Sequence, residues 1–180
     1  MQPESLPSAD TLIARLNLEP LPQEGGFFRQ AWKSETRLAP EALPVGYGQE
    51  HPAGTAIYFL VTQGPPTAVH RLVGTEVYHH YLGDPVRVHR WSPHGVYDPV
   101  RLGPPVDSET EPQRVVPPLH WQAVQVLSPG TGAGFALMGT TLAPGFVWED
   151  VVFADEATLR ALGKPEKQTG ADWVSGLGCV

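Results

Sequence analysis

The chain has 180 residues, enough for one domain that buries a hydrophobic core without disulfides. Its formal net charge of −7 and the lack of any Lys/Arg cluster argue against nucleic acid as a partner, because an acidic surface repels phosphate groups. A single cysteine, Cys179, excludes an internal disulfide framework. No apolar run reaches the ~18 residues of a membrane span and the first ten residues lack a secretory signal, so we expect a cytoplasmic protein without membrane contact.

The first predicted element is a short helix that Ser8 or Asp10 caps and that runs to about Asn17. A turn follows at Gly25 and Gly26, where we expect positive φ angles rather than a phosphate-binding loop. Aromatic and alternating residues then predict a strand over residues 27–33.

Short strands separated by turn residues fill the rest of the chain. The 20 Pro and 19 Gly residues fall between brief apolar runs, as they do in sandwiches and barrels. The predicted strands are residues 55–62, 67–73, 76–82, 86–91, 96–102, 114–116, 121–127, 134–141 and 146–153. Asp155 caps a last helix that ends near Gly163. The pattern predicts one all-β domain over residues 1–163, with short helices only at its ends, and a C-terminal tail over residues 164–180, from which Trp173 can dock back.

Residues 70–82 carry the richest set of ionisable side chains. We interpret them as a hairpin that turns at 73–75, with His70 facing inward on one strand and Glu76, Tyr78 and His80 on the other. Two imidazoles and a carboxylate in one pocket can bind a transition metal or can act as a general acid–base set.

The same segment resembles the first motif of the cupin superfamily, which has His-x-His, then Glu, then Gly at set spacing. His70, Glu76 and Gly83 match it, and Leu72 stands where the second His belongs. A second cupin motif has Pro, then Gly, then a His five residues after the Pro. Pro117 matches this motif, whereas the other two positions hold Leu119 and Gln122.

Further motifs are similar to the branch called cupin family 5, whose members resemble this chain over roughly residues 10–155. The matching stretches are residues 22–29 (Pro-x-Glu-Gly-Gly-Phe-x-Arg), 55–60, 70–76, 116–122 and 143–150 (Ala-Pro-Gly-Phe-x-x-Glu-Asp). The resemblance implies an RmlC-like jelly-roll β-barrel, a homodimer, and a likeness to the sugar-nucleotide epimerase cupins, which need no metal.

Several residues outside the first motif are candidates for ligand binding. Gln122 can donate and accept hydrogen bonds, which suits either recognition of a ligand or a structural bond. Arg29 and Glu149 lie in the matched stretches and are either ligand contacts or structural ion-pair members. The remaining histidines are expected at the surface: His51, His79, His89, His94 and His120.

Three functions stay open on this basis. One is an epimerase-like or isomerase-like enzyme that abstracts a proton next to a carbonyl of a sugar or nucleotide-sugar, with His70 as base and Glu76 or Tyr78 assisting. The second is a non-catalytic module that binds a small molecule. The third is a metal-dependent oxygenase or isomerase with a divalent ion at His70, Glu76 and His80, which Leu72 and Gln122 disfavour. We expect no cofactor.

Overall fold

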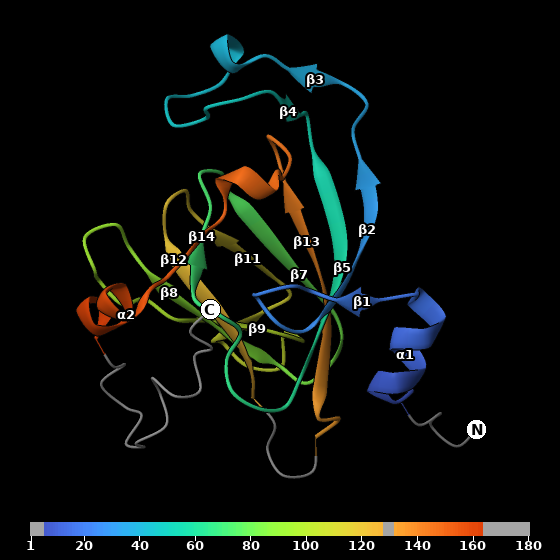
Figure 1. Cartoon of the computed structure of the whole chain (residues 1–180). Helices are drawn as coiled ribbons and strands as arrows, with labels where there is room; N and C mark the ends of the chain where they lie inside the picture. Colours follow the sequence, from blue (N-terminus) through green and yellow to red (C-terminus); the bar gives the residue numbers. More distant parts are fainter. Residues whose placement is uncertain (1–5, 128–131, 164–180) are drawn as a thin grey trace.

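The computed structural model describes residues 6–127 and 132–163, which form two six-stranded sheets packed face to face (Figure 1). The strand order is β1-β2-β5-β13-β7-β11 in the first sheet and β10-β9-β8-β12-β6-β14 in the second. All neighbouring strands of these two sheets are antiparallel except β9 and β10. The structure thus confirms a jelly roll built mostly of strands, whose two α-helices in the described residues lie near its ends. Two 3-10 helices, Pro40–Ala42 and Trp148–Asp150, interrupt the strands.

The strand bounds follow the apolar runs of the sequence. The first sheet contains β1 (Glu19–Pro20), β2 (Phe27–Lys33), β5 (Thr55–Thr62), β13 (Phe135–Leu142), β7 (Glu76–Gly83) and β11 (Gln113–Val116). The second contains β10 (Thr110–Glu111), β9 (Val100–Leu102), β8 (Val86–Trp91), β12 (Trp121–Val126), β6 (His70–Arg71) and β14 (Val152–Phe153). A further pair, β3 (Arg37–Leu38) and β4 (His51–Pro52), belongs to a flap of residues 34–54 that extends beyond one end of the barrel (Figure 1).

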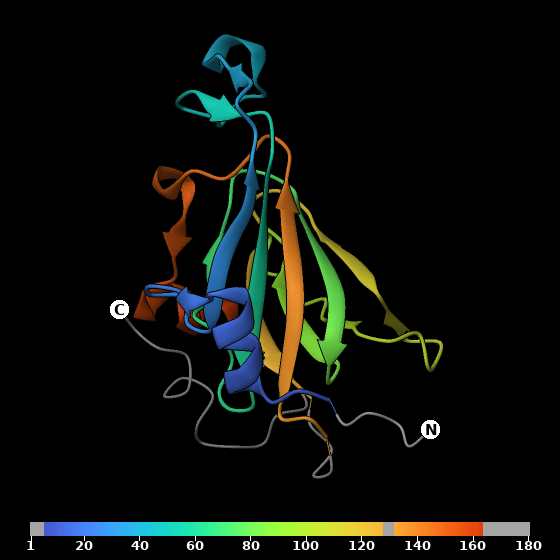
Figure 2. The same ribbon diagram turned by 90° about the vertical axis from the view of Figure 1, so that its right-hand side faces the viewer.

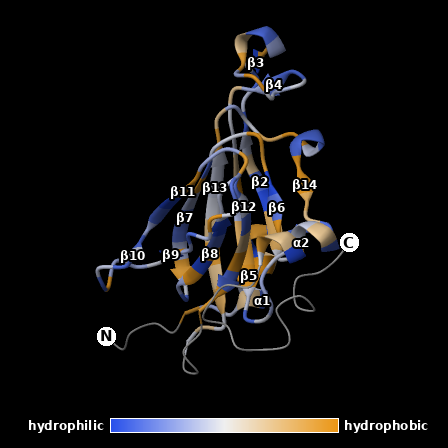
Figure 3. Ribbon diagram, turned by 90° about the vertical axis from the view of Figure 1, so that its left-hand side faces the viewer, coloured by the Kyte–Doolittle hydropathy of each residue, from blue (hydrophilic) through white to orange (hydrophobic). Residues whose placement is uncertain are grey.

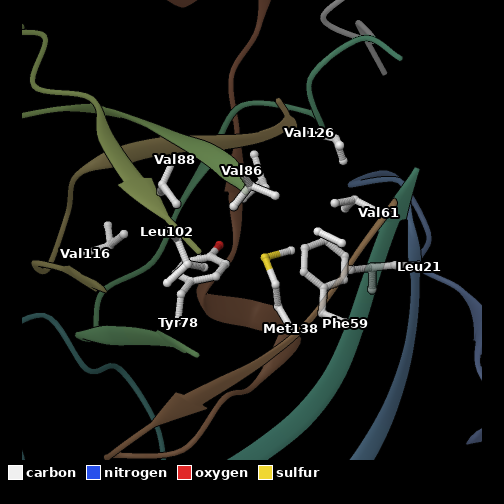
Figure 4. Packing of buried hydrophobic residues seen from close by; sticks show 12 residues of the cluster. Leu21, Phe59, Val61, Tyr78, Val86, Val88, Leu102, Val116, Val126 and Met138 are labelled. Atoms are coloured by element: carbon white, nitrogen blue, oxygen red, sulfur yellow. The ribbon is translucent and has the colours of Figure 1, made fainter. Parts of the chain in front are cut away.

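The main core lies between the two sheets because side chains alternate along each strand. On β5, Phe59 and Val61 point inward and pack with Tyr78 and Met138, whereas Leu60 faces the opposite side (Figure 4). Valines of β8 and β12 close the core from the second sheet. Inward-facing side chains of both sheets therefore pack into one core.

Two helices cover the outer faces of the sheets. Helix α1 (Ala9–Leu16) is capped by Ser8, whose hydroxyl accepts from the Thr11 amide, and it packs Leu12 near Leu60 outside the first sheet (Figure 2). Helix α2 (Glu156–Leu162), capped by Asp155 as predicted, packs Leu159 beside the second sheet, near β14 (Figure 3). No helix in the described ranges is long and apolar enough to cross a membrane.

The predicted hairpin at 73–75 is wrong. Strand β6 belongs to the second sheet, where it pairs with β12 and β14, and β7 belongs to the first sheet, where β13 and β11 occupy both of its edges. The segment between them crosses from one sheet to the other. His70 and Glu76 consequently face each other across the barrel rather than along one hairpin.

Candidate functional site

A cavity lies between the two sheets. The centre of a water-sized sphere can move through about 90 Å³ of it. A single water needs only about 10–15 Å³ of such space, so the cavity has room for a small molecule. Its wall is mostly apolar: Leu21, Phe28, Ile57, Phe59, Leu72, Leu142, Phe146, Trp148 and Val151. Its polar lining consists of Glu24, Gln30, Thr55, His70, Glu76 and Thr140.

His70 is 3% exposed and presents an unprotonated nitrogen within the site. Its Nδ1–H donates to the carbonyl oxygen of Ala68 at 3.1 Å, and since a carbonyl can only accept, the lone pair is left on Nε2. Nε2 lies 3.3 Å from Nε2 of Gln122, which donates to it, and 3.9 Å from Oε2 of Glu24. Burial lowers the pKa of His70, against opposing effects of Glu76 and the Ala68 bond, so the imidazole is a neutral base.

Glu76 stands at the start of β7 and is buried with His70. Gln122, which lies opposite His70 in the second sheet, donates through Nε2 to Oε2 of Glu76 at 2.6 Å. Burial and the nearby Glu24 raise the pKa of Glu76, whereas interaction with a protonated His70 and hydrogen bonds from Gln122 and Thr140 act in the opposite direction. One amide thus ties the imidazole of the second sheet to the carboxyl group of the first.

Glu24 is a third ionisable group of the cavity, and it was not among the residues predicted there from the sequence. It sits in a turn where Gln23, Gly25 and Gly26 all have positive φ, and where a Cβ on Gly26 would lie 2.8 Å from the carbonyl oxygen of Leu60. Burial raises the pKa of Glu24 to about 8, although 16% of its side chain remains exposed. The positive φ angles expected at Gly25 and Gly26 are confirmed. The sequence signal that could have pointed to Glu24 is the position of its carboxyl group directly before these two glycines.

Gln122, although bonded to His70 and Glu76, is not part of the cavity wall. Two further residues predicted at the site, Tyr78 and His80, also lie elsewhere. Tyr78 packs in the main core (Figure 4) and is not part of the cavity wall. Its hydroxyl group is hydrogen-bonded to Glu76. His80 is four residues along β7 from Glu76, a distance of about 13 Å at 3.3 Å per residue. A register shift between Leu137 and Met138 follows, and the His80 ring bonds to the carbonyl oxygen of Asp84 at 3.1 Å. The prediction for His80 was based on the alternation of side chains along the strand. It did not take into account how far His80 lies from Glu76.

Arg29 and Glu149 line an open outer groove of about 640 Å³ that shares Phe28 and Trp148 with the cavity. The guanidinium of Arg29 lies over the ring of Tyr58, 5.1 Å from its centroid. Glu149 accepts from the side-chain amide of Gln49 at 3.4 Å. The two residues thus stand at the entrance side of the site rather than in the cavity.

Two histidines expected at the surface are buried. Nδ1 of His51 lies 2.8 Å from the Gly145 carbonyl oxygen, to which it donates because a carbonyl only accepts, and Nε2 lies 3.1 Å from Asp150. His89 contacts the hydroxyl of Tyr97 at 2.8 Å, and burial lowers its pKa to about 4. The contacts of His51 come from distant parts of the chain, which is why its neighbours in the sequence gave no sign of them.

The family of the chain follows from a profile described as "Cupin superfamily (DUF985)", which matches residues 10–154. The chain belongs to the cupin superfamily. No curated protein gives a significant match.

Two solved structures resemble this cupin over most of their length. A hypothetical protein from Leishmania major has 28% sequence identity and a TM-score of 0.76, over 87% of this chain and 93% of the other. A protein from Shewanella oneidensis has 26% identity and a TM-score of 0.72, over 89% and 100%. Oxalate decarboxylase from Bacillus subtilis, at 14% identity and a TM-score of 0.50 over 77% of this chain and 30% of its own, shares the fold alone.

The donor set of this cupin does not fit a metal ion bound as in the two cupin motifs. Leu72, in place of the second His, contributes an apolar side chain to the cavity wall. The amide N–H groups of Gln122 already engage the lone pairs of His70 and Glu76 that a metal would need. Within residues 6–127 and 132–163, no group of three or more His, Cys, Asp or Glu side chains is arranged to hold a metal.

Proposed function

We propose that this cupin binds a small molecule in the cavity and moves a proton on it, as an epimerase-like or isomerase-like enzyme without a metal. The observation that carries the proposal is the pairing of a fixed, unprotonated His70 Nε2 with carboxyl groups in an enclosed, mostly apolar cavity. Titratable groups whose pKa values burial shifts, gathered in one cavity, are characteristic of acid–base sites.

His70 is the base of the proposed reaction. Its Nε2 takes the proton from a carbon next to a carbonyl group of the ligand, and the electron pair of the broken C–H bond moves toward the carbonyl oxygen. The imidazolium that forms is stabilised by the charge of Glu76, held at a fixed position by Gln122 and Thr140. Transfer of the proton from His70 to a neighbouring atom completes an isomerisation and regenerates His70. An epimerisation needs a proton delivered to the opposite face of the carbon by a second acid or by solvent, after which His70 releases its proton to solvent.

The size of the cavity bears on the substrate. It takes only the reacting part of a molecule as large as a nucleotide-sugar, and the remainder would lie in the outer groove beside Arg29 and Lys33. Smaller sugars and other small polar molecules fit without that groove. The reacting end is therefore the part that the cavity selects.

A ligand screen by thermal shift, followed by proton NMR of each binder in D₂O, tests the proposal. We expect a binder to exchange the proton next to its carbonyl group, and His70→Gln to slow this exchange at least about 100-fold, the usual range for loss of a general base. The exposed His94 provides the matched control, His94→Gln, which we expect to exchange as the wild type does.

Other outcomes would redirect the proposal. Binding that depends on His70 and Glu76 but gives no exchange would identify a non-catalytic binding module. If His70→Ala and Glu76→Gln both leave the binding of a hit unchanged, the cavity is not the ligand site.

A further inference from the structure

We propose that the ligand presents a positively charged nitrogen to the cavity, so that the substrate class is a small organic ammonium compound, and that Glu24 is its partner. This inference rests on the proposed function only in taking the cavity as the ligand site. It adds the charge of the ligand and the residue that selects it.

The charges around the cavity favour a cation. Glu24 and Glu76 both belong to its wall, and its described lining contains no Lys or Arg. Glu24 lies on the turn before β2, and its titratable neighbours are His70 on β6 and Glu76 and Tyr78 on β7. Among the ion pairs of the described residues, Glu24 pairs only with His70, at 3.9 Å, and that imidazole is neutral. Burying the ionised form of this carboxyl group without a cation is costly, and an ammonium group supplies the partner that the carboxylate lacks.

Gln122 leaves a buried hydrogen-bond acceptor beside His70 and Glu76. The amide oxygen Oε1 of Gln122 belongs to a side chain that is 1% exposed, and it has no partner within the described part of the chain. The amide nitrogen of the same group is already committed to His70 and Glu76. Gln122 is not part of the cavity wall, so the group that a ligand meets directly is Glu24, whose carboxylate requires a donor, and a primary ammonium has three N–H groups.

Aromatic rings of the cavity wall also favour a positively charged ligand. Phe28, Phe146 and Trp148 belong to the cavity wall, and the face of an aromatic ring attracts a cation electrostatically. An anionic group, by contrast, would meet two carboxyl groups and no cation. A neutral ligand of the same shape would gain the apolar contacts but would leave Glu24 without a partner.

Three probes of matched length test the charge preference directly: butylammonium, 1-butanol and butyrate, each at tens of millimolar, against the wild-type chain at pH 7. We expect butylammonium to raise the melting temperature and to bind at least tenfold more tightly in calorimetry than the other two. Burial raises the pKa of Glu24 to about 8, so ammonium binding below that pH displaces a proton. The affinity should therefore rise about tenfold per pH unit up to pH 8.

Substitutions test whether Glu24 is the residue that binds the ammonium group. Glu24→Gln should abolish both the preference for ammonium and the pH dependence of binding, whereas Glu35→Gln, at an exposed position outside the cavity, should change neither. The wild-type series stands by itself if Glu24→Gln fails to fold. Equal or tighter binding of 1-butanol or butyrate, or no binding of butylammonium, would overturn the inference. The proton-transfer proposal would survive either result, because it depends on exchange at His70.

Discussion

The side-chain amide of Gln122 on β12 donates a hydrogen bond of 2.6 Å to Glu76 on β7, and this bond joins the two sheets of the barrel. The same nitrogen donates to His70 at 3.3 Å. In the cupin motif a His belongs at position 122, so an amide here substitutes for a ligand and holds together the two groups that a metal would otherwise hold.

Replacing Gln122 by Leu should destabilise the protein by about 1–3 kcal/mol at pH 8, because the buried Glu76 loses one of its donors. The effect should be smaller at pH 5, where Glu76, whose pKa burial raises, is more readily protonated. Urea unfolding at both pH values measures the difference. The exposed Gln63→Leu is the control, and an effect of the same size at both pH values would contradict the explanation.

Glu24→Gln should make the protein more stable than the wild type, increasingly so as the pH rises. Burial raises the pKa of Glu24 from 4.5 to about 8, so between these values the folded state holds a proton that the unfolded state has lost. Stability from this group is fully present below pH 4.5 and falls by up to about 1.4 kcal/mol per pH unit until pH 8. Gln lacks this dependence. Denaturant titrations at several pH values measure it, and parallel curves for both proteins would refute it.

Restoring the missing histidines should create a metal site. Leu72 belongs to the cavity wall with His70 and Glu76, and Gln122 is bonded to both of these residues. The double variant Leu72→His, Gln122→His should retain a stoichiometric divalent metal through gel filtration, as measured by plasma emission spectroscopy. The wild type should retain none. Stoichiometric metal in the wild type would overturn the metal-independent part of the proposed function.

His51→Ala should cost about 1–3 kcal/mol, because His51 is 1% exposed and joins the β3–β4 flap to the carbonyl of Gly145 and to Asp150. The segment that it holds carries Phe146 and Trp148 of the cavity wall. His94→Ala, at an exposed position, should change stability by less than about 0.5 kcal/mol. Equal effects of the two variants in thermal unfolding would show that the buried contacts of His51 contribute nothing.

We expect a homodimer, as the family resemblance implies, formed through the outer face of the first sheet. Trp32 and Tyr81 are each 52% exposed there, beside the Arg29–Tyr58 pair, and large aromatic groups are common at interfaces. Light scattering should give twice the mass of the chain, and Trp32→Glu with Tyr81→Glu should halve it. A monomeric wild type would refute the dimer, and a dimeric double variant would place its interface elsewhere.

The sequence by itself determined the fold, because alternation of apolar residues, Pro and Gly turns and the caps at Ser8 and Asp155 are local properties. It also brought together His70, Glu76 and Gln122 through the cupin motifs. The tail of residues 164–180, with Trp173 and Cys179, lies outside the described residues.

Only the tertiary structure decided which residues form the site, because their side chains come from both sheets and from a loop. It placed β6 and β7 in different sheets and buried Tyr78 in the core. It also placed His80 four residues from Glu76 along β7, where its ring bonds to Asp84. It brought Glu24 to within 3.9 Å of His70, although 46 positions in the sequence separate them. Alternation tells which face of a strand a residue occupies, but the pairing of strands and the path of the turns determine which faces meet.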